Sequence, residues 1–336
     1  MKPRYLVRTT FSAARSLPHL PQTHPASRLH GHCFRVQVEA EEAQALETAL
    51  RQAAAVLDYN SLNELLPTPS DEHLARWFWS HLRHPDLVRI HLQSTDQQGV
   101  ILNAAGQTER WHRFRFESTH RLPRVPPGHR CGRMHGHGFS ATLCFRQSQA
   151  EEDSDPDRIQ RIWIPFQEKL QGHCLNELPG LENPTSELLA TWLWQHIQPI
   201  APELVQIQVQ ETGTAGCTYD GNTYRIWKEH CFESALRRDQ GHSYRLRLYL
   251  QAPLDPILGW TLDYGEVKTR FRPLYRQLDH HQLDEQLSLE PPDLLHLARW
   301  IEREALPVLP ALTGIELWET PVRGVRLGQV PHALPD

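Results

Sequence analysis

The residues with the clearest potential for chemistry in this chain are histidines that recur at a fixed interval. The tripeptide His-Gly-His occupies residues 30–32 and again residues 135–137, and a third copy, which reads Gln-Gly-His, occupies residues 240–242. Side chains alternate along an extended segment, so both histidines of a copy face the same side. Such a pair offers two imidazole nitrogens to a metal ion.

The middle copy has a third histidine in a suitable place. His120 ends the extended segment that precedes this copy, and a hairpin would bring it opposite His135 and His137. Three neutral imidazoles on rigid strands are a typical catalytic zinc set with one open coordination position. The alternative is that these are polar loop histidines without a ligand.

The other two copies cannot complete the same set. Arg15 stands at the position of the first histidine in copy one, and Leu236 and Gln240 replace the first two histidines in copy three. A cation, an alkyl group or an amide is no substitute for an imidazole ligand, and two histidines alone rarely hold zinc. The sequence therefore predicts one zinc ion per chain, bound by His120, His135 and His137.

Cys131 lies four residues before His135, in a polar, glycine-containing stretch. It could be a fourth metal ligand, or a thiolate base or nucleophile activated by the nearby cation. A lone cysteine is also often a small buried hydrophobe. The polar flanking residues argue against burial, and the other two copies have no cysteine at this offset.

A second marker repeats in step with the histidines. Leu-Ala-x-Trp occurs at residues 74–77, 189–192 and 297–300, so the chain consists of three tandem copies of one domain-sized unit. We place the units at residues 1–109, 110–222 and 223–336. Alternating apolar and polar residues predict two strands, a helix and further strands in each unit. An additional helix over residues 265–277 is expected in unit three only, giving the order β-β-α-(α)-β-β.

Composition excludes several classes of protein. The net charge of −5 provides no basic surface for nucleic acid. No apolar run approaches the roughly 20 residues of a membrane span, and no signal peptide is evident at the start of the chain. The six cysteines are scattered without the rhythm of a disulfide framework. This pattern suits a protein of the reducing cytoplasm.

Three motifs of the middle unit resemble one known family. They are residues 116–123 with the Cys-x-x-x-His-Gly-His of residues 131–137, residues 181–187 (Leu-Glu-Asn-Pro-Thr-Ser-Glu) and residues 211–217 (Glu-Thr-Gly-Thr-Ala-Gly-Cys). The chain is similar to the 6-pyruvoyl-tetrahydropterin synthase family, and most similar to its bacterial 6-carboxy-tetrahydropterin synthase branch, which acts in queuosine biosynthesis. Unit two resembles the family nearly throughout, and units one and three more weakly.

The resemblance implies a fold and an assembly. The fold class is α+β, with three tandem tunnelling-fold (T-fold) units that form a pseudo-trimeric antiparallel β-barrel with the helices on one side. In the family, two such rings stack. One fused chain should therefore form one ring, and two chains should form a homodimer.

The resemblance also implies roles for individual residues. Zinc would hold the side-chain oxygens of 7,8-dihydroneopterin triphosphate and acidify the adjacent C–H. Cys131 would act as base, Glu211 would anchor the pterin ring, and Thr185 would contact the substrate. An Asp-His pair in a Leu-Asp-His-His motif would relay a proton.

The motif residues are distributed unequally among the units. Unit two reads Leu-Gln-Gly-His at residues 170–173, whereas unit three retains Leu-Asp-His-His at residues 278–281. Unit one has Leu-Asp-Tyr at residues 57–59, which could instead match Leu-Asp-Tyr at residues 262–264. The counterparts of Glu211 are taken to be Gln93 and Glu319. We therefore expect one composite site between units two and three, with Asp279 and His280 as its relay.

The predicted function is a zinc-dependent 6-carboxy-5,6,7,8-tetrahydropterin synthase. The alternatives are a 6-pyruvoyl-tetrahydropterin synthase and a non-catalytic pterin-binding scaffold. A scaffold would explain the eroded sites in units one and three, but it would not explain why the surviving halves complement each other.

Overall fold

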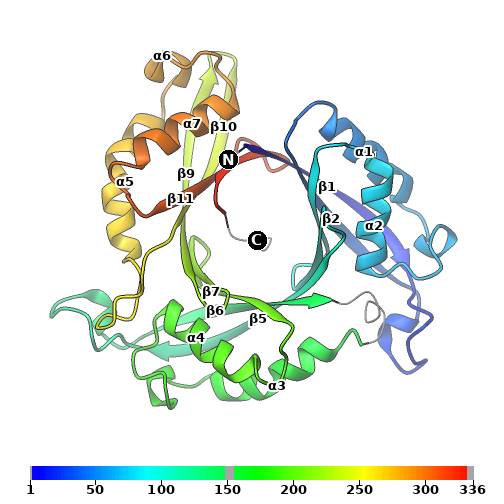
Figure 1. Cartoon of the computed structure of the whole chain (residues 1–336), viewed down its shortest axis with the longest axis horizontal. Coiled ribbons are helices and arrows are strands. Elements are labelled where there is room, and N and C mark those ends of the chain that lie inside the picture. Colours follow the sequence, from blue (N-terminus) through cyan, green and yellow to red (C-terminus); the bar gives the residue numbers. More distant parts are fainter. Residues whose placement is uncertain (1, 148–154, 331–336) are drawn as a thin grey trace.

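The protein is a closed β-barrel surrounded by helices. The computed structural model describes residues 2–147 and 155–330. Over these residues twelve antiparallel strands follow one another around the barrel in sequence order, and β12 pairs with β1 to close it. Figure 1 looks through the ring of strands and shows all labelled helices on its outer side. The expected α+β fold, with three tandem units around one pseudo-trimeric barrel, is confirmed.

Each unit contributes four strands, with its helices inserted between the second and third. Unit one comprises β1 (Arg4–Arg15), β2 (His30–Ala40), α1 (Leu46–Leu57), α2 (Asp71–Leu82), β3 (Leu87–Thr95) and β4 (Gln98–Asn103). Unit two comprises β5 (Thr108–His120), β6 (His135–Gln147), α3 (Arg158–Leu170), α4 (Ser186–Ile197), β7 (Leu204–Thr212) and β8 (Ala215–Tyr219). Unit three comprises β9 (Tyr224–Arg237), β10 (Gln240–Leu250), α5 (Tyr264–Leu278), α6 (Leu283–Leu287), α7 (Leu294–Ala305), β11 (Leu312–Trp318) and β12 (Arg323–Gly328).

The expectation that only unit three has the first helix is wrong. Helices α1 and α3 occupy the same place in units one and two as α5 in unit three. In α3, buried Ile159, Trp163, Phe166 and Leu170 recur at the spacing of one helical face. The remaining positions of α3 are mostly polar and include Pro165. This narrow apolar stripe is harder to recognise in the sequence than the broader one of α4.

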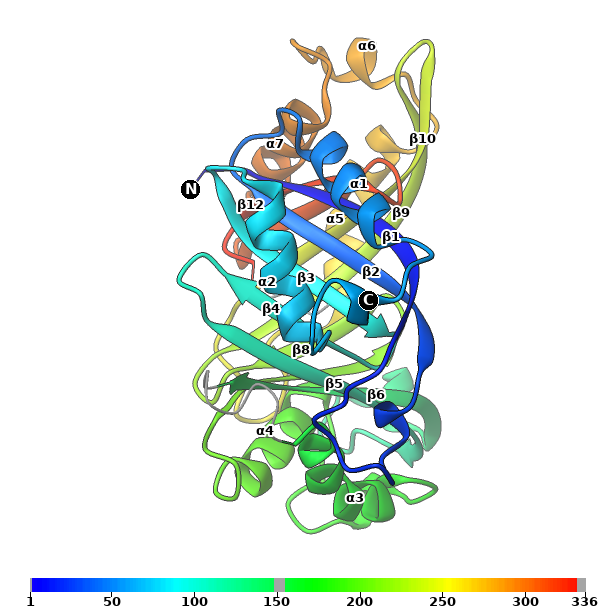
Figure 2. The same ribbon diagram turned by 90° about the vertical axis from the view of Figure 1, so that its right-hand side faces the viewer.

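The helices pack over the outer face of the barrel and bury one hydrophobic core per unit. Figure 2 shows α1 and α2 lying across the strands of unit one. The last helix of each unit begins at a capping side chain: the hydroxyls of Ser70 and Thr185 and the carboxylate of Asp293 accept backbone N–H bonds. No helix in residues 2–147 and 155–330 is both long and apolar enough to cross a membrane.

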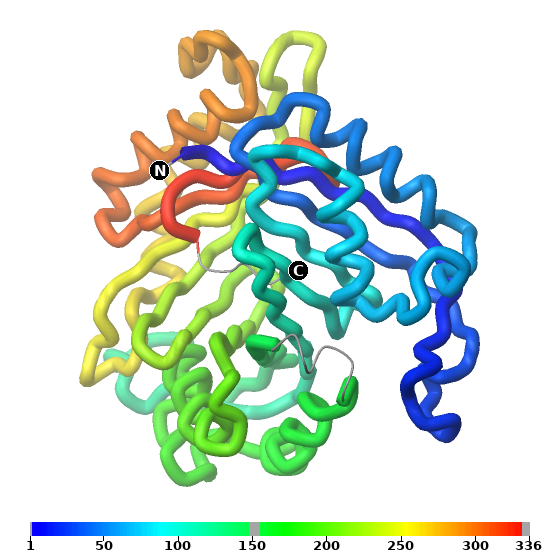
Figure 3. The backbone as a smooth tube through the Cα atoms, turned by 45° about the vertical axis from the view of Figure 1, so that its right-hand side comes forward, coloured from blue at the N-terminus to red at the C-terminus, as the bar shows by residue number. Residues whose placement is uncertain are grey.

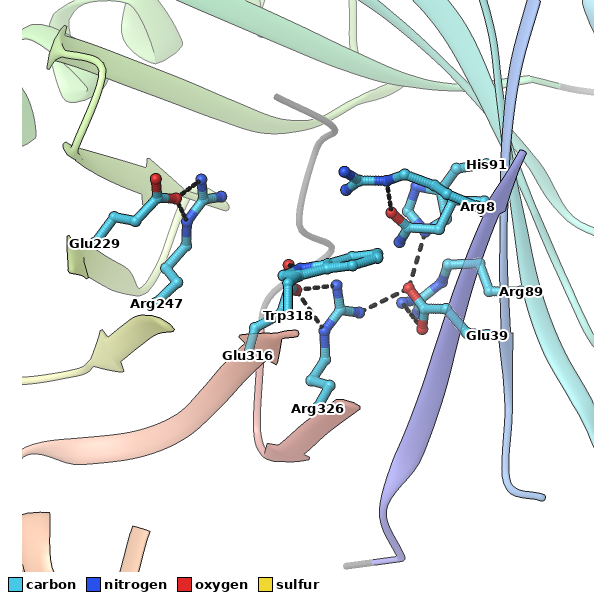
Figure 4. Close-up of polar contacts among 10 residues, drawn as sticks. Arg8, Glu39, Arg89, His91, Glu229, Arg247, Glu316, Trp318 and Arg326 are labelled. Atoms are coloured by element: carbon cyan, nitrogen blue, oxygen red, sulfur yellow. Dashed lines mark hydrogen bonds and ion pairs between the residues drawn. The ribbon is translucent and has the colours of Figure 1, made fainter. Parts of the chain in front are cut away.

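Inside the barrel, a buried ion network joins the two ends of the chain where β12 meets β1. The Arg326 guanidinium lies 2.7 Å from a carboxylate oxygen of Glu39 in unit one and also binds Glu316 in unit three (Figure 4). Burial opposes ionisation of Glu39, but the charges of Arg326 and Arg89 hold the pKa of its carboxyl well below the usual range. Since β1 and β12 share only a short ladder, this network adds a second link across the closure.

Candidate metal and substrate site

Three histidines of unit two converge at one end of the β5–β6 hairpin. His120 is the residue directly opposite His135 in the ladder, and His137 follows one pleat later on the same face. One ligand nitrogen or more from each ring lies within 4.8 Å of the other two. The ring centroids are 4.5 Å apart for His120 and His135, and 5.0 Å apart for His135 and His137. Strand pairing thus brings together residues that the sequence separates.

One ring nitrogen of His120 and one of His135 make hydrogen bonds, and the other nitrogen of each ring remains available to bind a ligand. His120 Nδ1 lies 3.1 Å from the carbonyl oxygen of Pro184, and His135 Nδ1 lies 2.7 Å from that of Arg133. A carbonyl only accepts, so both Nδ1 atoms carry the proton and both Nε2 atoms present a lone pair. Nε2 of His120 is buried and has no partner among the described residues. A carbonyl that fixes the tautomer in this way is typical of metal-binding histidines.

The electrostatics also favour neutral rings. Burial lowers the pKa of His120 to about 4, even though the Pro184 carbonyl acts in the opposite direction. Burial and the neighbouring His135 lower the pKa of His137. Metal ligation requires unprotonated imidazoles. The donor set, the tautomers of His120 and His135, and the lowered pKa values of His120 and His137 therefore fit a zinc ion with one open position.

Unit one fills the equivalent position with a cation of its own. Arg15 donates to the carbonyl of Pro69 at 3.0 Å, just as His120 bonds to that of Pro184, and it pairs with Asp71 at 2.7 Å. Burial, together with the Arg15 charge, lowers the pKa of His32 to about 4. In unit three, β9 and β10 are joined by a two-residue turn, and Leu236 is buried there. Within the part of the chain that the structure describes, only unit two offers three ligands.

The histidine cluster opens into a cavity of about 590 Å³ between units two and three. Its wall from unit two includes Cys131, Glu211 and the start of α4, and its wall from unit three includes Lys228 and residues 260–265. Figures 1 and 3 show the two loops that meet here, residues 121–134 in teal and residues 251–263 in yellow. A cavity of this size suits a small organic molecule.

Cys131 lies in the wall of this cavity, in a short 3-10 turn, and is half-buried. Its sulfur is not among the atoms that form the histidine cluster. Burial raises the pKa of its thiol, while the Arg130 guanidinium acts to lower it. The arrangement favours a thiol that faces the ligand cavity over a fourth metal ligand.

Glu211 is the residue before the last of β7 and contributes a carboxyl group to the cavity. Ser186 donates a hydrogen bond to it at 2.9 Å. Burial raises its pKa to about 7, and the negative charge of nearby Glu187 acts in the same direction. Glu187 itself accepts two hydrogen bonds from Thr261 of unit three, at 2.7 and 2.9 Å. A ligand that donates N–H hydrogen bonds to the Glu211 carboxyl would therefore stabilise it.

Thr185 lines the cavity but its hydroxyl is already engaged. It caps α4 by accepting from Leu188 N at 3.1 Å, and it donates to the Gly259 carbonyl of unit three. The side chain thus holds the two units together at the cavity. Its assignment as a substrate-binding residue stays a prediction.

The counterpart of Glu211 in unit one is Ser94, and the assignment of Gln93 is wrong. Gln93 pairs with Gly99 in the ladder as Gln210 pairs with Gly216, so Ser94 corresponds to Glu211. Asp71 in turn corresponds to Ser186, and Ser94 donates to Asp71 at 2.7 Å. Unit one has therefore exchanged the carboxyl and the hydroxyl of this pair. The exchange places its carboxylate against Arg15.

The structure does not bring Asp279 and His280 to the cavity within one chain. They follow the last residue of α5, whereas the cavity is lined by the first residues of this helix, about 22 Å away at 1.5 Å per residue. Figure 1 shows α5 running from the loop beside unit two toward α6. His280 Nδ1 lies 3.0 Å from Asp279, and its side chain is 75% exposed. The relay thus lies next to the eroded histidine set of its own unit.

Residues 57–59 match residues 278–280, and the suggested match to residues 262–264 is wrong. The backbone N–H groups of Tyr59, Gly172 and His280 make the same bond to the first strand of their units, and all three residues have positive φ. The side chains of Asp58 and Asp279 accept from that strand in the same way. The Asp of this motif therefore has a structural role in units one and three.

The unit-three wall of the cavity was not predicted. Asp263 caps α5 through Gly265 N at 2.6 Å and pairs with His129 of unit two at 3.2 Å, and Trp260 lies against the same histidine. Asp157 and His24 form the matching pair between units two and one, at 3.0 Å. The repeat of a histidine 105 residues apart, at His24 and His129, was the signal available in the sequence.

Comparison with known proteins supports the repeat and assigns the family. The family profile described as 6-pyruvoyl tetrahydropterin synthase matches three times, over residues 5–103, 109–222 and 225–329. The chain belongs to this family. A 6-carboxy-5,6,7,8-tetrahydropterin synthase from Synechocystis is 31% identical over 115 residues, which cover 32% of this chain and 88% of that protein.

Two solved structures match this chain at low identity and low TM-score. The 6-pyruvoyl tetrahydropterin synthase of Caenorhabditis elegans is 14% identical and has a TM-score of 0.32, with 38% of this chain and all of that chain covered. A urate oxidase from Bacillus sp. TB-90 is 9% identical and has a TM-score of 0.34, with 65% of this chain and 99% of that chain covered.

Proposed function

We propose that this protein is a zinc-dependent 6-carboxy-5,6,7,8-tetrahydropterin synthase that acts on 7,8-dihydroneopterin triphosphate and releases triphosphate and acetaldehyde. One observation carries the proposal: the cluster of three histidines reaches the interface cavity through His135 and His137, and a thiol and a carboxyl of raised pKa line the same cavity. The similarity to the 6-carboxy-5,6,7,8-tetrahydropterin synthase of Synechocystis supports the carboxy product over the pyruvoyl product. So does the Cys-x-x-x-His-Gly-His spacing.

We assign the chain's own residues to substrate binding and to proton transfer. Zinc, when bound by His120, His135 and His137, would hold the side-chain oxygens of the substrate and acidify the adjacent C–H. Cys131, which lines the cavity, would take that proton as a thiolate. Glu211, once ionised, accepts N–H bonds from the pterin ring, and such charge-assisted bonds would favour its ionised form.

A proton relay at this site must come from a second chain or from another residue of unit two. Asp279 and His280 do not reach the zinc cluster of their own chain, and the corresponding Gly172 in unit two leaves a hollow of about 430 Å³ beside His137. A Cβ on Gly172 would meet nothing within 4 Å. We propose that two chains form a homodimer by stacking their barrels, so that the exposed His280 of one chain approaches unit two of the other. A dimeric mass in light scattering is the expected result, and a trimer or hexamer of full-length chains would contradict it.

His173 is the alternative proton carrier in unit two. It is exposed, and its Nδ1 lies 3.0 Å from the Gln171 carbonyl. Turnover that survives in His280→Ala but is lost in His173→Ala would place the whole site within unit two.

The loss of Asp and His at residues 171 and 172 also favours a second candidate function, a non-catalytic pterin-binding scaffold. Incubation of the zinc-loaded chain with 7,8-dihydroneopterin triphosphate separates the two. The synthase releases acetaldehyde, and the Cys131→Ala chain serves as the matched control for non-enzymatic breakdown. Binding of the pterin without acetaldehyde from the unmodified chain would establish the scaffold.

A further inference from the structure

Lys228 is a half-buried cation in the unit-three wall of the cavity. It lies on β9, and its Nζ donates to Thr214 Oγ1 at 2.9 Å. Burial lowers the pKa of its ammonium, and the charges of Lys268 and Arg130 lower it further. Arg130 comes from unit two and also lines the cavity, and Lys268 lies on the first turns of α5. The three residues Arg130, Lys228 and Lys268 are called the seam cations below.

The carboxylates nearest to the seam cations, Asp263 and Glu229, already bind other groups. Asp263 binds the first N–H groups of α5 with one oxygen and His129 with the other. Glu229, which follows Lys228, binds the Arg247 guanidinium through two nitrogens. Across residues 2–147 and 155–330, no ion pair to a carboxylate is found for any of the seam cations. Among the described residues, Arg130 and Lys228 thus line the cavity from the two sides of the seam with no carboxylate bound to either, and the charge of the exposed Lys268 adds to theirs. An anion bound there would offset their mutual repulsion.

These cations occur only at the interface that carries the histidine cluster. Lys228 pairs with Ala215 next to the Gly216–Trp227 pair, and the matching position at the seam of units one and two is His112, beside the Gly99–Trp111 pair. The seam of units three and one has Val7 there. Arg130 corresponds to Pro25, because the 3-10 turns of the two loops align. The sequence contains only four lysines, and two of them belong to this group.

We propose that the seam cations form an anion subsite that holds the triphosphate tail of the substrate, so that unit three selects phosphorylated pterins for the zinc cluster of unit two. This inference rests on the proposed function. A lysine acts on phosphate as a point charge, and an arginine can bind it through two parallel N–H bonds. The subsite would hold triphosphate after its elimination as well, which makes triphosphate a competitive inhibitor.

The direct test is calorimetric binding of inorganic tripolyphosphate to the metal-free chain, because polyphosphate would otherwise chelate zinc. Lys228→Gln is expected to weaken binding roughly tenfold or more, the loss typical of one contact between charged groups. Lys228→Arg should restore most of the affinity. Lys169→Gln, on the exposed face of α3 and outside the cavity, is the matched control and should bind like the unmodified chain. Equal binding by the unmodified chain and Lys228→Gln would overturn the subsite, as would no binding by either.

Kinetics separate this inference from the proposed function. In the zinc-loaded enzyme, Lys228→Gln should raise KM for 7,8-dihydroneopterin triphosphate roughly tenfold with kcat little changed, since it removes binding energy shared by substrate and transition state. Inhibition by dihydroneopterin, which lacks phosphate, should be unchanged. If the Lys228→Gln variant produces acetaldehyde with an unaltered KM, the proposed anion subsite is refuted and the proposed synthase activity is not. If tripolyphosphate binding depends on Lys228 but the unmodified chain releases no acetaldehyde, the anion subsite is supported and the proposed synthase activity is refuted. Lys268→Gln, at an exposed position, supplies a second variant if Lys228→Gln fails to fold.

Discussion

Replacing Glu211 by glutamine should stabilise the protein and disable it at the same time. The pKa of Glu211 rises from 4.5 in the unfolded chain to about 7 in the folded one, mainly through burial. Since folding raises this pKa, the folded chain binds the proton more tightly, and stability is lost as pH rises from about 4.5 through about 7. At about 1.4 kcal/mol for each pKa unit, ionisation costs the folded state about 3 kcal/mol above pH 7.

A glutamine has no charge to desolvate and can still accept from Ser186. The free energy of unfolding of Glu211→Gln, relative to the unmodified chain, should therefore grow by about 3 kcal/mol between pH 4.5 and pH 8. Urea unfolding of both metal-free chains across this pH range measures the difference. Glu177→Gln makes the same chemical change at an exposed position of unit two and serves as control. A pH-independent difference between Glu211→Gln and the unmodified chain would refute the reasoning.

Although Glu211→Gln should raise stability, it should weaken ligand binding. A neutral amide offers one acceptor and turns an NH₂ group toward the N–H donors of a pterin ring. Glu211→Gln should therefore lose pterin binding at pH 8, measured by calorimetry with dihydroneopterin. Retained affinity in this variant would remove Glu211 from the role of ring anchor.

The remaining predictions concern the metal, the base, the relay and the barrel closure. His120→Ala should lose zinc, whereas His30→Ala should keep one zinc per chain in metal analysis; two or three tightly bound ions would contradict the assignment. Cys131→Ala should abolish acetaldehyde release with zinc content unchanged, because a base acts on the barrier and not on metal affinity, and joint loss of zinc would make the cysteine a ligand. His280→Ala should lower kcat by roughly 10²–10⁴-fold, the range for a general acid–base group, and a normal rate would exclude it. Arg326→Ala should cost about 3–5 kcal/mol in urea unfolding, because it leaves Glu316 buried without its ion-pair partner and Glu39 with Arg89 alone; a change below about 1 kcal/mol would show that the closure does not depend on this network.

Local sequence was sufficient for the features that depend on neighbouring residues. The alternating segments became strands, and Ser70, Thr185 and Asp293 cap their helices by accepting from the backbone N–H three residues further along. The histidine cluster was also accessible. His135 and His137 share a face because of the two-residue period of a strand, and a simple hairpin brings His120 opposite them.

Register errors account for the mistaken correspondences. A shift of one residue moves a side chain to the other face of a strand, and the sequence alone did not reveal that Ser94, and not Gln93, matches Glu211. The same limitation applied to residues 57–59, whose match to residues 278–280 rests on backbone hydrogen bonds and positive φ. Such features depend on which strands pair, and pairing is not encoded locally.

The sequence by itself determined that the chain is a threefold repeat and that the set of three histidines survives in one unit, because both follow from residue identity and spacing. The resemblance of its motifs indicated the tetrahydropterin synthase family. Only the tertiary structure decided that Lys228 and residues 260–265 complete the cavity while Asp279 and His280 lie at the far end of α5. The reason is physical: closure of the barrel places the start of one unit's helix against the loop of the preceding unit, a contact between segments more than a hundred residues apart.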